Sequence, residues 1–139
     1  MQRTRISLLP TPPVPLSGER LDEKRLDEKY AALLARIAAR KSVAVAFSGG
    51  VDSSFLCHAA FAALSARAIA VTIVSPMLPR SELDAATALA RRIGIEHVCV
   101  EEMEIDGKVA ENPRERCYFC KKLEFASIRE AARERGIDA

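Results

Sequence analysis

Residues 48–54, Ser-Gly-Gly-Val-Asp-Ser-Ser, constrain the fold of this chain more than any other stretch. The run before them, Val43 to Phe47, is short, apolar and partly β-branched, as buried strands are. The run after them, Phe55 to Leu64, is apolar and rich in helix formers. The sequence therefore predicts a strand, a tight glycine turn and a helix in direct succession.

The turn of this unit has the features of an anion site. Two adjacent glycines, Gly49 and Gly50, let backbone N–H groups come close to a ligand because no Cβ stands in the way. The helix that follows leaves its first N–H groups unpaired and carries a partial positive charge at its start. Ser48, Ser53 and Ser54 add hydroxyl donors. Together these groups favour a site for phosphate.

Asp52 is the residue of the turn that would repel a phosphate. Its presence is explained if the carboxylate binds a divalent cation that bridges to phosphate oxygens, and Mg²⁺ prefers oxygen ligands. The alternative is a glycine turn in which Ser or Asp only caps a helix. The complete run of residues between a strand and a helix favours the phosphate site, with Asp52 as a magnesium ligand.

The run SGGVDSS resembles the SGGxDS[ST] signature of PP-loop ATP pyrophosphatases, and it matches neither the Walker pattern nor G-x-G-x-x-G. The resemblance implies an α/β fold of the adenine nucleotide alpha hydrolase type, with a doubly wound parallel sheet. It also implies that ATP, with Mg²⁺, is cleaved between its α- and β-phosphates and that AMP is placed on a substrate oxygen. Asp52 and Ser53 are then the catalytic candidates. The nucleotide-binding candidates are Phe47, Ser48, Gly49, Gly50, Asp52, Ser53, Ser54 and Ser75.

The rest of the chain reads as further α/β units. Residues 19–40, 53–66 and 80–93 read as helices. Ser81 is the expected cap of the last helix, with Asp84 at the reach-back position of a capping box and Gly94 at its end. Residues 68–75 and 95–100 read as strands. The alternation predicts a parallel sheet in the order 3-2-1, with the first strand at the switch point. Ser75 and Met77 follow the second strand and are predicted to approach the adenosine, although the two prolines nearby also suit a plain exit loop.

Composition limits the other classes of function. The chain has 139 residues, enough for one domain, and we divide it into a proline-rich tail at 1–18 and a nucleotide-binding domain at 19–139. The net charge of +2, from 21 basic and 19 acidic residues, gives no push toward nucleic acid or membrane. No apolar run is long enough for a bilayer, and the amino terminus does not resemble a secretory signal. A cytoplasmic protein with free thiols is therefore expected.

Cys117 and Cys120 form a second chemical feature. Three positions apart, they would lie on one face of a helix, where two thiolates suit a metal or iron–sulfur cluster, a redox pair or a structural role. Cys57 and Cys99 belong to predicted core elements, so they are poor candidates for further ligands. His97 is expected at an exposed or polar face of its strand.

Residues 112–121, N-P-x-x-R-C-Y-x-C-K, are similar to a segment of the LarE family, the ATP-dependent sulfur transferases of nickel-pincer nucleotide synthesis. The resemblance covers residues 25–139. It implies that a carboxylate of a biscarboxylated pyridinium mononucleotide is adenylated and that sulfur then displaces AMP to leave a thiocarboxylate. Some members use up the sulfur of their own cysteine, and others carry it on a [4Fe–4S] cluster held by three cysteines. The Cys117–Cys120 pair resembles the cluster type, whose third ligand comes from a segment not present in this chain.

By this resemblance the chain corresponds to the amino-terminal half of such an enzyme, with a sheet that stops after three strands. The first strand would then be an exposed edge, so we expect either association of copies, as a homo-oligomer, through that edge or an unstable chain. Two alternatives stay open: a nucleotide-binding module without turnover, and tRNA thiolation, in which a PP-loop is also paired with CxxC. The near-neutral charge disfavours tRNA, and the expected partner is a small-molecule nucleotide.

Overall fold

The computed structural model of the chain describes residues 23–102 and 116–138, so the predicted tail at 1–18 lies outside the described residues. The elements follow in the order α1 (Glu23–Ala38), β1 (Val43–Ala46), α2 (Val51–Leu64), η1 (Ser65–Arg67), β2 (Ala68–Val74), α3 (Arg80–Ile93), β3 (Glu96–Glu101) and α5 (Arg116–Glu134).

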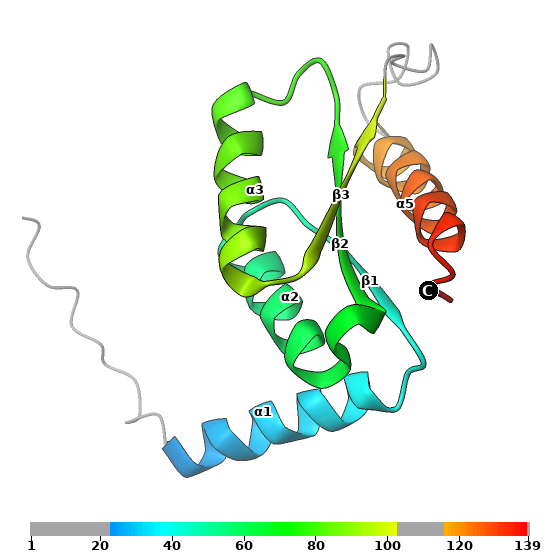
Figure 1. Cartoon of the computed structure of the whole chain (residues 1–139). Helices are drawn as coiled ribbons and strands as arrows, with labels where there is room; N and C mark the ends of the chain where they lie inside the picture. The colour runs from blue at the N-terminus through cyan, green and yellow to red at the C-terminus, as the bar shows by residue number, and fades with distance from the viewer. Residues whose placement is uncertain (1–22, 103–115, 139) are drawn as a thin grey trace, which may run out of the picture.

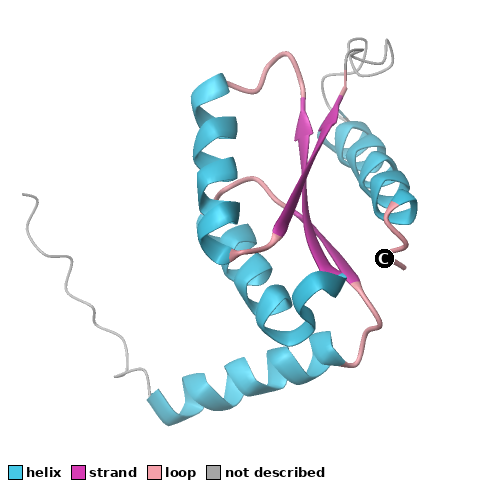
Figure 2. Ribbon diagram, in the orientation of Figure 1, coloured by secondary structure: helices cyan, strands magenta, loops and turns pink. Residues whose placement is uncertain are grey.

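The strands form one parallel sheet in the order β1-β2-β3 (Figure 2). This confirms the predicted parallel sheet and its strand order. Ala46 at the end of β1 pairs with Val71 in β2, and Val71 pairs with Val98 in β3. The carboxyl ends of all three strands therefore meet at one edge of the sheet, which is where open α/β sheets bind ligands.

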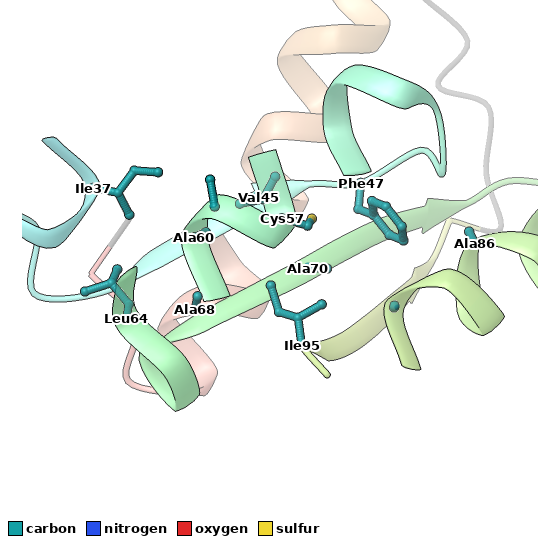
Figure 3. Close-up of a cluster of buried hydrophobic side chains, with 12 residues drawn as sticks. Ile37, Val45, Phe47, Cys57, Ala60, Leu64, Ala68, Ala70, Ala86 and Ile95 are labelled. Carbon is teal, nitrogen blue, oxygen red and sulfur yellow. The ribbon is translucent and has the colours of Figure 1, made fainter. Parts of the chain in front are cut away.

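Helices cover both faces of this sheet. Figure 1 shows α2 and α3 on one face and α5 on the other, with α1 crossing below α2. The central strand β2 is buried over its first five residues because both of its faces are covered. Its side chains alternate between the two faces, so Ala68 and Ala70 pack toward α2 and α3 (Figure 3), whereas Ile69 and Val71 join Ile128 of α5.

The start of α3 differs from the prediction. The helix begins at Arg80 with Pro79 in the N-cap position, and Ser81 lies inside the first turn. Pro79 is extended, with φ −60° and ψ 136°, and its fixed φ suits the entry to a helix without a side-chain cap. Asp84, expected to reach back in a capping box, instead forms an exposed ion pair with Arg80 at 3.6 Å. The helix ends at Gly94 as predicted, in a left-handed conformation with φ 87°.

Of the two cysteines predicted to lie in the core, Cys57 does and Cys99 does not. Cys57 is fully buried between α2 and the sheet, whereas Cys99 is exposed. β3 is an edge strand with a single neighbour, so residues near its carboxyl end are covered less than those of β2. None of the helices within the described ranges has the length and hydropathy needed to cross a bilayer.

The end of α5 brings the chain back to the first strand. Gly136 has a positive φ of 68°, Ile137 is buried, and the Asp138 N–H donates to the Ser42 hydroxyl at 3.0 Å. Ser42 directly precedes β1, so the described chain ends beside the start of that strand. The expected association through the edge of β1 stays a prediction.

The two-sided burial of β2 can be tested by truncating one of its side chains. Ile69→Ala is expected to lower the free energy of unfolding by about 2–5 kcal/mol, because Ile69 is only 1% exposed and its neighbours cannot collapse around it. Leu26→Ala on α1, where the side chain is 44% exposed, is the control and should cost less than about 1 kcal/mol. Denaturant unfolding measures both, and equal losses would contradict the central place of β2.

Candidate functional site

The glycine turn lies at the carboxyl end of β1. The Phe47 N–H still donates to the Val71 carbonyl at 2.8 Å, so the sheet pairing continues one residue beyond β1 itself. Gly49 then turns the chain with φ 79°, and Gly50, extended at φ −72° and ψ 168°, is the N-cap residue of α2. The predicted succession of strand, turn and helix is confirmed, with α2 starting at Val51, ahead of the predicted Ser53.

Gly49 is required here for two reasons. Its φ is in the left-handed region, which costs a residue with a Cβ about 1–2 kcal/mol. A Cβ on Gly49 would also lie 3.1 Å from the Cβ of Ala86 in α3, closer than such atoms ordinarily approach. The turn is therefore packed directly on α3, and a small residue is needed at both positions.

Ser48, Ser53 and Ser54 all form hydrogen bonds at the turn or at the helix start that follows it. The Ser48 and Ser53 hydroxyls lie 3.1 Å apart, and the Ser48 N–H donates to the Ser53 oxygen at 3.3 Å. The Ser54 hydroxyl donates to the Gly50 carbonyl at 2.6 Å, along the helix axis rather than into the turn. Ser48 and Ser53 thus hold the shape of the turn, and their roles as ligands of a nucleotide stay predictions.

The amino end of α2 offers backbone N–H groups to a ligand, whereas the N–H groups of Ser48 and Gly50 donate to serine hydroxyls within the turn. Gly50 supplies no side-chain cap, and the intrahelical bonds begin with the Ser54 N–H, which donates to the Gly50 carbonyl at 3.0 Å. The N–H groups before it, with the helix dipole, favour an anion. Asp52 lies exposed in this first helical turn. Within the described ranges no three His, Cys, Asp or Glu side chains converge as a metal site, and the role of Asp52 as a magnesium ligand stays a prediction.

A cavity of about 230 Å³ opens beside the turn, at the carboxyl ends of β1 and β2 and between α3 and α5. Phe47 and Ser48 form the side nearest the turn, and two carboxylates face it, Glu82 from α3 and Glu124 from α5. The complete lining is Ala46, Phe47, Ser48, Val71, Thr72, Ile73, Leu78, Glu82, Leu83, Ala86, Glu124 and Ile128.

Ser75 lies just past β2, at the predicted edge of the sheet. Its carbonyl accepts the Leu78 N–H at 3.0 Å, which forms a turn that brings Leu78 to the cavity. Among the described residues, Ile73 and Leu78 line the cavity here, whereas Ser75 and the exposed Met77 are outside its lining. The contact of Ser75 with adenosine stays a prediction.

The thiols outside the Cys117–Cys120 pair are poor metal ligands. Burial raises the pKa of Cys57 to about 11. Burial, together with the negative charge of Glu101, also raises the pKa of Cys99. Both therefore stay protonated near neutral pH, whereas metal ligands are thiolates. The backbone at Cys117 and Cys120 belongs to α5, as the helical spacing predicted, but their side chains lie outside the described ones.

Thr72 is a residue of this site that the sequence analysis missed. Its buried hydroxyl lies 2.7 Å from the Phe47 carbonyl and 2.8 Å from His97 Nε2. His97, which was expected at an exposed or polar face of its strand, is half-buried, and its ring packs edge-on against Phe47 at 5.5 Å between centroids. Burial lowers the pKa of His97. The sequence could not predict these bonds, because a threonine within an apolar strand does not indicate which residues of the neighbouring strands it contacts.

The parallel sheet, the glycine turn at its carboxyl edge and the adjoining cavity define a nucleotide-binding domain of the PP-loop type. A family model described as asparagine synthase matches residues 27–119, and the chain therefore belongs to the asparagine synthase family.

The chain is similar to several known proteins, among them two curated relatives and one solved structure. The uncharacterized protein slr1717 of Synechocystis sp. is 45% identical over 55% of this chain and 29% of its own length. The pyridinium-3,5-bisthiocarboxylic acid mononucleotide synthase of Lactiplantibacillus plantarum is 28% identical over 82% of this chain and 42% of its own. The NH3-dependent NAD synthetase of Campylobacter jejuni, solved with a nitrate ion, is 15% identical with a TM-score of 0.65, over 80% of this chain and 53% of its own.

These similarities confirm the PP-loop fold, and the last of them concerns the fold alone. The chain spans less than half the length of the two curated relatives that it matches. The activity of the whole enzymes is therefore a matter for proposal.

The close packing of the turn can be tested with a matched pair of glycines. Gly136→Ala should lower stability by about 1–2 kcal/mol, because Gly136 has a positive φ of 68° but open space around the new methyl group. Gly49→Ala should cost about 1–3 kcal/mol more, because the methyl group also meets Ala86. Thermal and denaturant unfolding compare the two variants. Equal losses of stability in the two variants would mean that α3 moves to accommodate the new methyl group at no cost and therefore does not fix the turn.

Proposed function

We propose that the chain binds ATP with Mg²⁺ at the glycine turn and takes part in the adenylation of a carboxylate. The observation that carries the proposal is the turn itself: Gly49 at positive φ and Gly50 at an uncapped helix start, beside a cavity at the carboxyl edge of the sheet. Family membership supports it, and so does the similarity to the Lactiplantibacillus plantarum synthase.

In this proposal the two parts of ATP bind at different places, and the charges around the site support that division. The amino end of α2 attracts the phosphates, whereas Glu82 and Glu124 repel them from the cavity. The uncharged adenosine can enter the cavity, where Ile73 and Leu78 offer apolar surface and the carboxylates can accept hydrogen bonds from ribose hydroxyls or an amino group.

The proposed reaction is an in-line displacement at the α-phosphorus. A substrate carboxylate oxygen forms a bond to that phosphorus, the bond to the oxygen bridging toward the β-phosphate breaks, and pyrophosphate leaves with the electron pair. Negative charge develops on pyrophosphate, which the N–H groups of the turn and the start of α2 would stabilise. A Mg²⁺ ion held by Asp52 would offset further phosphate charge.

We further propose that the carboxylate belongs to a biscarboxylated pyridinium mononucleotide. A sulfide-level sulfur nucleophile then attacks the acyl carbon, the bond from that carbon to the AMP oxygen breaks, and AMP leaves with the electron pair, so that a thiocarboxylate remains. The support is the similarity to the Lactiplantibacillus plantarum synthase over 82% of this chain. Positions 117, 120 and 124 also share one face of α5 by their spacing, and Glu124 lines the cavity. The cysteine positions therefore lie on the helix that closes the proposed nucleotide site.

Product analysis tests the first step. The chain is incubated with ATP, Mg²⁺ and the pyridinium substrate, and AMP and pyrophosphate are quantified. Asp52→Asn should reduce AMP formation by at least about a hundredfold, because the proposed ligand of the Mg²⁺ ion that offsets phosphate charge is lost. Asp84→Asn, an exposed carboxylate on α3 paired only with Arg80 among the described residues, should leave the rate unchanged.

Each failure has a distinct meaning. ATP that binds but is never cleaved by the wild-type chain would favour a nucleotide-binding module without turnover. AMP formed with tRNA in place of the pyridinium nucleotide would favour tRNA thiolation. AMP formation that survives in Asp52→Asn would remove Asp52 from the magnesium site.

The cysteine pair is tested by anaerobic reconstitution with iron and sulfide. We expect the wild-type chain and Cys99→Ser to bind iron alike, because the Cys99 thiol has a raised pKa and stays protonated. The double variant Cys117→Ser and Cys120→Ser should lose at least about nine-tenths of the bound iron, since clusters are held by thiolates. Iron content and the visible absorption of the cluster are the measurements, and equal iron in all three proteins would refute a cluster at this pair.

A further inference from the structure

A chain of hydrogen bonds links the edge strand β3 to the start of the glycine turn. His97 Nε2 lies 2.8 Å from the Thr72 hydroxyl, and that hydroxyl lies 2.7 Å from the Phe47 carbonyl oxygen. Thr72 is only 5% exposed, and the residues before it on the same face of β2 are the alanines Ala68 and Ala70. A polar group at this depth is stable only because both of its neighbours bond to it.

The direction of these bonds follows from the groups involved. A carbonyl oxygen can only accept, so the single hydroxyl proton of Thr72 goes to Phe47. The Thr72 oxygen must then accept from His97, which assigns the imidazole proton to Nε2. The ring of His97 also meets the ring of Phe47 edge to face, at an interplanar angle of 85°. Phe47 is thus held by His97 both directly and through Thr72.

The peptide between Phe47 and Ser48 is fixed at both of its ends. Its carbonyl accepts from Thr72, and its N–H donates to the Ser53 hydroxyl at 3.3 Å. It is the first peptide of the turn, so a rotation about it would move Ser48 and swing Gly49 away from Ala86. The plane of this peptide therefore controls where the following N–H groups point.

We propose that Thr72 and His97 are positioning residues that hold the glycine turn in the conformation required for nucleotide binding. This inference rests on the proposed function of the turn as the ATP site. Thr72 itself lines the cavity, whereas His97 is outside the lining. An effect of His97 on the ligand must therefore pass through Thr72 and Phe47.

A purely structural role would give a different result. Removing a buried hydrogen bond that only supports the sheet lowers the stability of the whole domain and leaves a folded protein with an unchanged turn. Removing a positioning group loosens the turn in the folded protein. Hydrogen exchange at the turn, measured without ligand, separates the two roles.

The test combines hydrogen exchange with equilibrium binding of ATP and Mg²⁺. Thr72→Val, which keeps the shape of the side chain, should speed exchange of the Ser48 and Gly50 amides by up to about tenfold and weaken ATP binding by a similar factor. His97→Phe, which keeps a ring against Phe47 but removes the donor, should act in the same direction. Thr72→Ser and His97→Gln retain the groups that bond and should restore both values toward wild type.

Thr87→Val is the matched control. It removes a hydroxyl that donates to the Leu83 carbonyl within α3 at 2.9 Å and does not touch the turn, so exchange at the turn and ATP affinity should stay at wild-type values. Turn exchange or ATP affinity that is unchanged in folded Thr72→Val would overturn the inference. A wild-type chain that fails to bind ATP would instead refute the proposed function, and faster turn exchange in Thr72→Val would still establish the positioning of the turn.

Discussion

The contact between Gly49 and Ala86 fixes the place of the glycine turn in this domain. A Cβ at Gly49 would lie only 3.1 Å from the Cβ of Ala86. The backbone of the turn is therefore packed directly against the Ala86 methyl group of α3, with no room for a further side chain. This contact sets the turn beside the middle of α3, and the first turn of that helix contributes Glu82 and Leu83 to the cavity. The site lies at the carboxyl edge of the sheet, and the contact between Gly49 and Ala86 fixes the position of the turn at that edge.

The charges of the site are of opposite sign at the turn and in the cavity. The uncapped start of α2 carries the partial positive charge of a helix dipole, and the far wall of the cavity carries Glu82 and Glu124. A ligand with phosphates at one end and an uncharged ring at the other matches this arrangement in one orientation. A ligand with negative charge throughout would bring that charge against the two carboxylates, which is electrostatically unfavourable.

The sequence was most informative where local chemistry decides the structure. The Gly49–Gly50 turn between an apolar run and a helix-forming run predicted the loop, and the alternation of elements predicted the sheet order. The cap of α3 was predicted wrongly at Ser81 because serine has a high propensity for the N-cap position. The helix begins earlier, with Pro79 as its N-cap residue. Cys99 was wrongly predicted to lie in the core, because the apolar sequence of a strand does not show which of its two faces is covered by a helix.

The contacts missed by the sequence analysis are those between distant strands. The bond between Thr72 and Phe47 joins residues 25 positions apart, and so does the bond between Thr72 and His97. Each of these residues has an ordinary local context, and only the register of β1, β2 and β3 brings them together. A polar residue in a predicted central strand therefore calls for a search of the neighbouring strands for its partner.

The position of α5 gives the proposed two-step reaction a physical basis. Its residues Glu124 and Ile128 line the cavity, and Cys120 lies one helical turn before Glu124, about 6 Å along the axis at the usual rise per residue. An acyl adenylate formed in the cavity is reactive toward water, so a sulfur donor is most effective when it is close and the site is shielded. Helix α5 lines the cavity through Glu124 and Ile128 and carries the backbone of the cysteine pair, so the proposal puts the sulfur chemistry on the element that bounds the proposed nucleotide site.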